Sequence, residues 1–355
     1  MRIVSGLNRQ EIEPCTHVVA VGAFDGVHRG HQLLLEYVCR RAHEEGVHSA
    51  IFTFEPIPAQ VFRPREGKGG LRLTLVDERN ELLQDGCPDL AVVANFDKAF
   101  RSMSAHDFAR DVLVGTLHTT TLVASQRHTF GRNAEDDVTR IEELGQELGF
   151  EVAVLDQFTV EDGEPVTSTR IRKLLWAGEA GEAARLLGRL YSITGGVRSG
   201  RGVGRTLGFP TANVDIPAEK LVPAEGIYAA FAETEGLPPT PTAVNLGPAP
   251  TFEVHERLLE AHLITDQPVD LVGRALCVEL IERLRGVRKF ENPEALKAQI
   301  AQDVAAVQEA CAQHDPAGNG AACWLSEASV YGHGRPRPRA QIALRSAGAG
   351  VPSEH

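Results

Sequence analysis

The chain has 355 residues, a formal net charge of −12 and 43% hydrophobic residues. This length predicts two domains, and the apolar content is sufficient for a core in each. The acidic balance argues against a nucleic-acid-binding protein, because neutralising phosphates requires clustered Lys and Arg. The sequence has no run of about 18 apolar residues, so we expect no transmembrane helix and no membrane partner.

The six cysteines lie at positions 15, 39, 87, 277, 311 and 323. None forms a Cys-x-x-Cys pair, so the sequence predicts neither a zinc site nor a redox motif. Scattered single thiols are typical of a reducing cytoplasm. The N-terminus lacks a signal-peptide pattern, since Glu11 and Glu13 interrupt it early. We therefore expect a cytoplasmic protein.

In the first half of the chain, short apolar runs alternate with helical patterns. Strands are expected at 17–21, 50–54, 90–94, 121–124 and 151–155, with helices at 30–45, 136–148, 168–177 and 179–187. Alternating β and α units predict an α/β domain with a mostly parallel sheet covered by helices on both faces. Ligands of such sheets bind at the carboxyl ends of the strands.

The segment Gly22-Ala-Phe-Asp-Gly-Val-His28-Arg-Gly-His31 joins the first expected strand to the first helix. His31 falls in the first helical turn, where free N–H groups and the helix dipole favour anions. Two imidazoles there can hold nucleotide phosphates and stabilise the charge that grows on a departing pyrophosphate. The alternative is a pair of surface histidines near a helix start. The expected nucleotide-binding residues of this loop are Gly22, Phe24, Asp25 and Gly26, with His28 and His31 as catalytic residues.

A second segment, Thr167-Ser-Thr-Arg-Ile-Arg172, precedes a helical pattern. Ser168 or Thr169 is a plausible N-cap. Arg170 and Arg172 are basic donors suited to phosphate. A capped helix with solvated arginines is the alternative, and capping and nucleotide binding by Ser168, Thr169 and Arg170 can coexist.

After Gly188, which ends the second short helix, glycine and proline become frequent. Strands are expected at 191–197, 226–232, 242–246, 258–264 and 275–284. Frequent turns between short strands predict a small closed barrel. A last helix is expected at 293–312, with Pro293 in its first turn. The Ala-, Gly-, Pro- and Ser-rich remainder, 313–355, is expected to be a disordered tail.

The stretch from Gly195 to Asn213 holds six glycines and two ligand-type side chains in nineteen residues. Such a loop can cradle an anion with its N–H groups. Thr211 and Asn213 point to the same side if the chain is extended, and their oxygens suit Mg²⁺. A glycine-rich hairpin without a ligand is the alternative. The expected phosphate-binding positions are Gly200, Gly204, Arg205, Gly208 and Pro210.

With its Gly-Phe-Pro-Thr-Ala-Asn ending, this stretch resembles the flavokinase signature of the bacterial bifunctional riboflavin kinase/FAD synthetase family. The resemblance runs in order from about Val18 to about Asp303, and it includes the HxGH segment and the Thr167–Arg172 segment. It implies a Rossmann-like FAD synthetase domain over 1–187 and a riboflavin kinase barrel over 188–312. It also implies that riboflavin and ATP give FMN, that FMN and ATP give FAD and pyrophosphate, and that Mg²⁺ serves both reactions. No protein partner is indicated.

Leu259-Glu-Ala-His262-Leu resembles the family strand whose glutamate is the general base, which implies that role for Glu260. The alternative for Glu260 is an ordinary solvent-facing strand residue, and for His262 a packed or surface histidine. The resemblance also implies flavin contacts for Arg285 and Phe290.

The chain departs from the family pattern at several positions. Ala23, Ile57, Ser125 and Arg127 replace Asn, His, Gly and an acidic or amide residue, and Val272 replaces Tyr. Three alternatives stay open, and the changes at Ala23, Ile57 and Arg127 motivate the first of them. The first is a riboflavin kinase with an inactive or regulatory N-terminal domain. The others are a non-catalytic flavin or nucleotide sensor and a nucleotidyltransferase for another small phosphorylated substrate.

Overall fold

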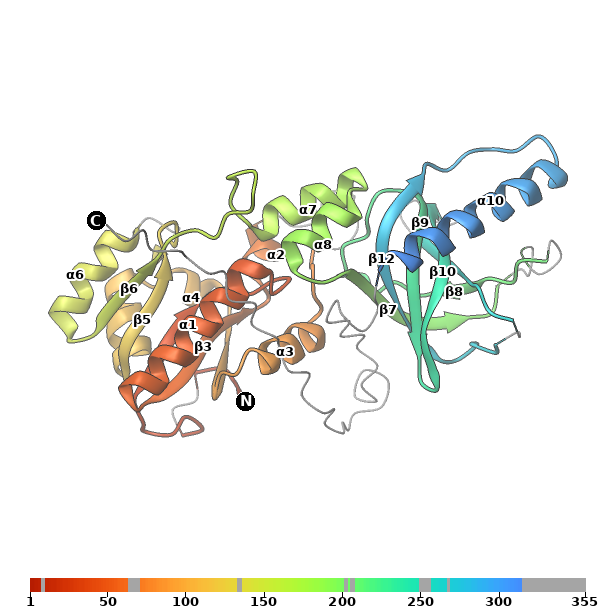
Figure 1. The fold of residues 1–355 in the computed structure, drawn as a ribbon. Helices are drawn as coiled ribbons and strands as arrows, with labels where there is room; N and C mark the ends of the chain where they lie inside the picture. The colour runs from red at the N-terminus through yellow and green to blue at the C-terminus, as the bar shows by residue number, and fades with distance from the viewer. Residues whose placement is uncertain are drawn as a thin grey trace, which may run out of the picture.

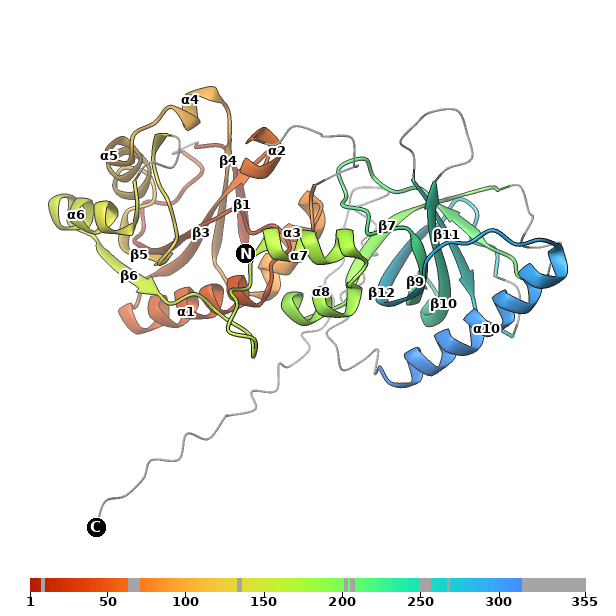
Figure 2. The same ribbon diagram turned by 90° about the horizontal axis from the view of Figure 1, so that it is seen from above.

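The computed structural model describes residues 1–7, 10–62, 71–132, 136–200, 204, 208–248, 257–266 and 269–314. A helix-covered sheet and a β-barrel are joined by a pair of helices, α7 and α8, that lies between them in both views (Figures 1 and 2). Among the described residues, no helix is long and apolar enough to cross a membrane. Arg205 and the expected tail beyond residue 314 lie outside the described residues.

The sheet has six parallel strands in the order β1-β4-β3-β2-β5-β6. Its strands are β1 (Arg2–Ser5), β2 (His17–Val21), β3 (His48–Glu55), β4 (Leu90–Asn95), β5 (Thr119–Ser125) and β6 (Glu151–Leu155). Its helices are α1 (Arg29–Glu45), α2 (Pro58–Phe62), α3 (Val76–Asp85), α4 (Lys98–Arg101), α5 (Ala105–Asp107), the π-helical η1 (Phe108–Val114) and α6 (Val138–Leu148).

The sheet is buried on both faces, because its strands are apolar at successive positions. Val19 and Val21 of β2 belong to a core shared with η1 and α6, whereas Val18 and Ala20 belong to the core under α1. β2 lies between β3 and β5 in this order. The strands β3 and β4 are added on one side of β2, and β5 and β6 are added on the other, so the order of the strands reverses at β2. The carboxyl ends of β2 and β5 therefore flank the switch point at which ligands bind in such folds.

The second half is a closed antiparallel barrel in the order β10-β11-β8-β7-β12-β9. Its strands are β7 (Tyr191–Arg198), β8 (Ala212–Val214), β9 (Gly226–Thr234), β10 (Leu237–Pro248), β11 (Arg257–Leu263) and β12 (Ala275–Arg285). The last helix, α10 (Pro293–Ala312), packs Val307 and Cys311 against Phe231 and Ile281 on the outside of the barrel.

The expected fold class is confirmed, with the sheet, the barrel and the last helix in place. Helices α7 (Ser168–Ala177) and α8 (Ala180–Leu187) precede the barrel in the chain but share its core, because Leu175 and Leu186 cluster with Ile193 and Val278. The first half is thus bound to the barrel by apolar packing. The N-cap of α7 is Thr167, whose Oγ1 accepts a hydrogen bond from Arg170 N at 3.1 Å, and not Ser168 or Thr169.

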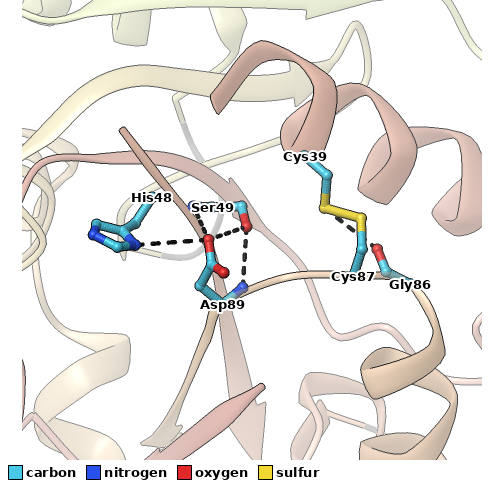
Figure 3. Close-up of a disulfide and its surroundings, with 6 residues drawn as sticks. All are labelled: Cys39, His48, Ser49, Gly86, Cys87 and Asp89. Carbon is cyan, nitrogen blue, oxygen red and sulfur yellow. Dashed lines mark hydrogen bonds and ion pairs between the residues drawn. A yellow bond between two sulfur atoms is a disulfide. The ribbon is translucent and has the colours of Figure 1, made fainter. Parts of the chain in front are cut away.

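The expectation of scattered single thiols is wrong for Cys39 and Cys87, which form a disulfide (Figure 3). Cys39 is on α1 and Cys87 follows α3. A Cβ on Gly86 would lie 2.9 Å from Leu35 Cδ1, so the end of α3 fits closely on α1. This packing brings together two cysteines that are 48 residues apart in the sequence, with a Cα–Cα distance of 6.5 Å. Cys15 and Cys311 are free.

Candidate active sites

The loop at 22–28, between β2 and α1, is buried and has an uncommon backbone. The side chains of Phe24, Asp25 and His28 are at most 6% exposed. Phe24, Gly26 and Val27 have φ values of 49°, 85° and 35°. A left-handed backbone is strained for Phe and more so for β-branched Val, and such strain persists where the surroundings enforce it. Gly26 N donates to Thr74 Oγ1 at 3.0 Å, which is one of these restraints.

His28 and His31 lie together at the start of α1. His28 Nδ1 accepts a hydrogen bond from His31 N at 3.4 Å, and the two rings stack with centroids 3.7 Å apart. Burial, reinforced by the positive charge of Arg189, lowers the pKa of His28 to about 3. Burial and the neighbouring His28 hold the pKa of His31 well below its usual value. Both imidazoles are therefore neutral at pH 7, and among the described residues His31 Nδ1 is buried without a hydrogen-bond partner.

His128, which the sequence analysis did not assign, is a third imidazole of this region. It follows β5, and its ring stacks on Phe130 at 4.5 Å. Burial lowers the pKa of His128 to about 4, and its charge contributes to lowering the pKa of His31. The signal that would have found it is topological: the segments after β2 and after β5 meet at the switch point of the sheet.

The Asp25 side chain is held by contacts within the protein. Its carboxylate is 1% exposed, accepts hydrogen bonds from the backbone N–H groups of Leu73 and Thr74, and pairs with Arg172 Nη2 at 2.5 Å. Asp25 thereby ties the loop to α7 and to the segment before α3. A nucleotide contact at Asp25 stays a prediction.

Residues of the second segment hold the same loop. Ser168 Oγ donates to Asp25 O at 2.8 Å. Arg170 pairs with Asp162 and donates to Glu164 O at 3.0 Å, while Thr169 is exposed. Phosphate contacts by Ser168, Thr169 and Arg170 stay a prediction.

Four positions depart from the family pattern in this half of the chain: Ala23, which lies in the loop itself, and Ile57, Ser125 and Arg127. Ala23 O accepts a hydrogen bond from Thr53, and Ile57 is fully buried. Ser125 ends β5, and Arg127 is exposed beside it. Of the four, Arg127 alone brings a charged side chain to the carboxyl end of the sheet.

In the barrel, Glu260 lies between two other polar side chains. It is opposite Asn213 in the β11–β8 pairing and opposite Asn245 in the β10–β11 pairing. Asn245 Nδ2 donates to Glu260 Oε2 at 3.0 Å, and among the described residues Asn245 Oδ1 is buried without a partner. The strand period puts these three on the side opposite the core residues Ala212, Val244 and Ala261.

The glycine-rich stretch approaches these residues closely. A Cβ on Gly200 would lie 1.9 Å from Asn213 Nδ2, and one on Gly204 would lie 2.3 Å from Phe209 O. Gly208 has a φ of 90°. Pro210 O is 2.8 Å from His262 Nδ1, so the imidazole of His262 fastens the end of the stretch to β11.

The oxygen donors of this cluster suit Mg²⁺. Thr211 offers a hydroxyl, Asn213 an amide oxygen and Glu260 a carboxylate, and Asn245 Oδ1 is a further acceptor that has no partner within the described part of the chain. Mg²⁺ favours such hard oxygen ligands and binds through one or two carboxylates together with substrate phosphates. The residues present therefore fit the expected ion.

The two expected flavin contacts lie at the junction of β12 and α10. Arg285 pairs with both oxygens of Asp303, at 2.9 and 2.6 Å. Phe290 has the guanidinium of Arg285 at 5.9 Å and that of Arg288 at 4.9 Å from its ring centroid. Flavin binding by Arg285 and Phe290 stays a prediction.

Comparisons with known proteins agree with this two-part arrangement. The family model described as FAD synthetase matches residues 10–170, and the model described as riboflavin kinase matches residues 187–311. The bifunctional riboflavin kinase/FMN adenylyltransferase of Escherichia coli K12 is 33% identical over 87% of this chain and 96% of its own length. The protein of the same name from Pseudomonas fluorescens is 36% identical over 87% and 97%.

Among solved structures, one titled as a macrolide-efflux protein from Streptococcus pneumoniae superposes with a TM-score of 0.77 at 26% identity. The match covers 86% of this chain and 98% of that one. Sheet, helical pair, barrel and last helix are thus a known combination in one polypeptide.

Proposed function

The chain belongs to the bifunctional riboflavin kinase/FMN adenylyltransferase family, and from this premise we propose which residues perform each reaction. It phosphorylates riboflavin to FMN and adenylylates FMN to FAD, with ATP as the co-substrate. Membership favours this interpretation over a kinase with an inactive N-terminal domain. The proposed division assigns adenylylation to residues 1–187 and phosphorylation to residues 188–312.

The proposed adenylylation site is the switch point of the sheet. An oxygen of the FMN phosphate attacks the α-phosphorus of ATP, the α–β linkage breaks, and pyrophosphate leaves. His28 and His31 are neutral, so each ring can donate one N–H hydrogen bond to a phosphate oxygen without repelling the other ring. Donors fixed in place before the reaction stabilise the charge that develops on the leaving group. Gly22 and Gly26 are further proposed nucleotide-binding positions of this loop.

The proposed phosphorylation site is the outward face of β8, β10 and β11. Glu260 accepts the proton of the primary alcohol of riboflavin as the alcohol oxygen attacks the γ-phosphorus of ATP, the linkage between the β- and γ-phosphates breaks, and ADP leaves. The hydrogen bond from Asn245 orients one carboxylate oxygen and leaves the other available for the alcohol. The glycine-rich stretch with Gly200, Gly204 and Arg205 would hold the phosphates. Mg²⁺, held by Thr211 and Asn213, would neutralise phosphate charge in this site.

The observation that carries this proposal is the contact of Asn245 with Glu260 directly across from Asn213. Arg285 and Phe290 are the proposed flavin contacts. A cytoplasmic location is also part of the proposal, because both reactions consume ATP.

Replacing Glu260 with Gln tests the assignment. The variant keeps the hydrogen bond with Asn245 but removes the base, so we expect phosphorylation of riboflavin to fall by roughly 100-fold or more. Adenylylation of FMN by the same protein should be unchanged. Normal phosphorylation by the Gln variant would refute the role of Glu260.

A further inference from the structure

The turn that connects the two halves of the chain lies directly on the histidine-bearing loop. We call residues 187–189 the junction turn. A Cβ on Gly188 would lie 3.1 Å from Arg29 Cγ, and one on Gly26 would lie 3.4 Å from Leu187 Cδ2. The junction turn therefore packs against both the loop at 22–28 and the first turn of α1.

Hydrogen bonds connect the junction turn to the backbone of this loop. Arg189 Nη2 donates to Gly26 O at 2.8 Å, and its Nη1 donates to Val27 O at 3.4 Å. From α1, Gln32 Nε2 lies 2.9 Å from both Val27 O and Leu187 O. Two carbonyls immediately before His28 are thus held by groups from the junction turn and from α1.

One of these carbonyls, Val27 O, belongs to a residue with a strained backbone. Val27 has a φ of 35° and Gly26 a φ of 85°. A non-glycine residue held in this region costs about 1–3 kcal/mol, and it persists only when several contacts enforce it. Arg189 supplies contacts on both sides of the strained Gly26–Val27 peptide, whose position sets where the His28 ring lies.

The charge of Arg189 also acts on the imidazoles. Burial lowers the pKa of Arg189 to about 10, so it stays charged at neutral pH. Its positive charge lowers the pKa of His28 and of His31, together with smaller contributions from Arg172 and His128. The acidic groups that face Arg189 are Glu78, Glu279 and Asp25.

We propose that Arg189, although it lies at the start of the kinase half, is a positioning residue for adenylylation that fixes the Gly26–Val27 backbone and thereby the His28 and His31 rings. This inference rests on the proposed role of the two histidines. It makes the junction turn part of the support of the adenylylation site. Among the described residues, the hydrogen bonds of Arg189 go to Gly26 O, Val27 O and Leu187 O, and none goes to the cluster around Glu260.

The test compares Arg189→Ala, Arg189→Lys and Arg185→Ala in the full chain, measuring both activities of each purified protein. Arg185 is a matched control, because it is on α8 and pairs with Glu182 on the surface. We expect Arg189→Ala to lower the kcat of FMN adenylylation by roughly 10- to 100-fold, the usual cost of small misplacement, and to leave riboflavin phosphorylation within about twofold. Arg189→Lys should recover most of the loss, and Arg185→Ala should change neither activity.

The pH dependence separates positioning from a general loss of structure. Without the guanidinium charge the pKa values of His28 and His31 rise, so the acid limb of the adenylylation profile of Arg189→Ala should move to higher pH. Parallel loss of both activities, or unchanged adenylylation, would overturn the proposal. If Arg189→Ala does not fold, Gln32→Leu gives the same test at Val27 O, and unchanged adenylylation by that variant would overturn it too.

A His31→Ala variant distinguishes the proposed role of the histidines in adenylylation from the proposed positioning role of Arg189. If it adenylylates FMN normally, the proposed role of the histidine fails. If it is inactive while Arg189→Ala is fully active, only the positioning role fails.

Discussion

Lys220 lies between β8 and β9, and its ammonium reaches from the barrel half into the sheet half. Its Nζ is 2.5 Å from Glu78 Oε2 and 2.9 Å from Leu73 O, and the two charged side chains are 1% and 5% exposed. Lys220→Met removes the cation and leaves the Glu78 carboxylate buried. We predict that it lowers the free energy of unfolding by about 3–5 kcal/mol, the usual effect of breaking a buried ion pair.

A remaining hydrogen bond of Glu78 sets where in this range the loss falls. Glu78 Oε2 keeps the hydrogen bond from Leu75 N at 2.8 Å, which favours the lower half of the range. Removing both charges with Glu78→Gln and Lys220→Met leaves no unpaired ion, so the double variant should be closer in stability to the parent than Lys220→Met is. At roughly 2–4 °C per kcal/mol, the single variant should lose roughly 6–16 °C in Tm.

Urea unfolding followed by circular dichroism, together with thermal scans, measures these differences across the double-variant cycle. Lys173→Met is the matched control, because Lys173 is exposed on α7 and its replacement should change stability by less than about 0.5 kcal/mol. A loss below about 1 kcal/mol for Lys220→Met, with no coupling to Glu78, would show that this ion pair does not stabilise the fold.

Three further predictions concern other parts of the chain. Burial, with the nearby Glu233, raises the pKa of Glu279 from 4.5 to about 7. Between these two pKa values Glu279 is protonated in the native state and ionised in the unfolded state. The free energy of unfolding therefore falls as the pH rises through this range. Gln does not titrate, so the free energy of unfolding of Glu279→Gln minus that of the parent, measured in urea, should rise by on the order of 3 kcal/mol from pH 5 to pH 8. A difference that stays constant over this pH range would contradict the prediction. Cys39→Ser removes the disulfide with Cys87, which links residues 48 positions apart, and should lower the free energy of unfolding by roughly 2–4 kcal/mol in the absence of reductant. If the variant and the parent are equally stable without reductant, the bond does not stabilise the protein. Gly200→Ala places a Cβ 1.9 Å from Asn213 Nδ2, so riboflavin phosphorylation should fall at least about tenfold while FMN adenylylation is unaffected; full kinase activity would show that Asn213 can move freely.

The parts of the molecule that local patterns determine could be predicted from the sequence. The apolar run of β2, the HxGH segment and the start of α1 are contiguous, and so are the glycine-rich stretch and β8. The alternation of strands and helices also indicated the sheet and the barrel. Each of these inferences needs only neighbours within about twenty residues.

The partners of charged residues could not be predicted in this way. Asp25 and Arg172 are 147 residues apart, and Lys220 and Glu78 are 142 apart. A motif shows that a carboxylate is present but not whether a distant arginine has already paired with it, so the pairing of Asp25 with Arg172 was not predicted. Cys39 and Cys87 were missed for the same reason, since only the packing of α3 on α1 brings them together.

Asn245 and His128 show a different limit. Asn245 lies in the expected strand 242–246 and His128 directly follows Arg127, but neither residue type signals a role alone. Asn245 becomes a candidate site residue only because the strand register sets it beside Glu260. His128 becomes one because β5, which it follows, lies next to β2 in the sheet.

Chromatographic analysis of products from riboflavin and, separately, from FMN tests the two-site account most directly, using Glu260→Gln and His31→Ala with ATP and Mg²⁺. The account predicts that Glu260→Gln makes no FMN from riboflavin but converts FMN to FAD, whereas His31→Ala converts riboflavin to FMN and stops there. Loss of both conversions in either folded variant would contradict the account.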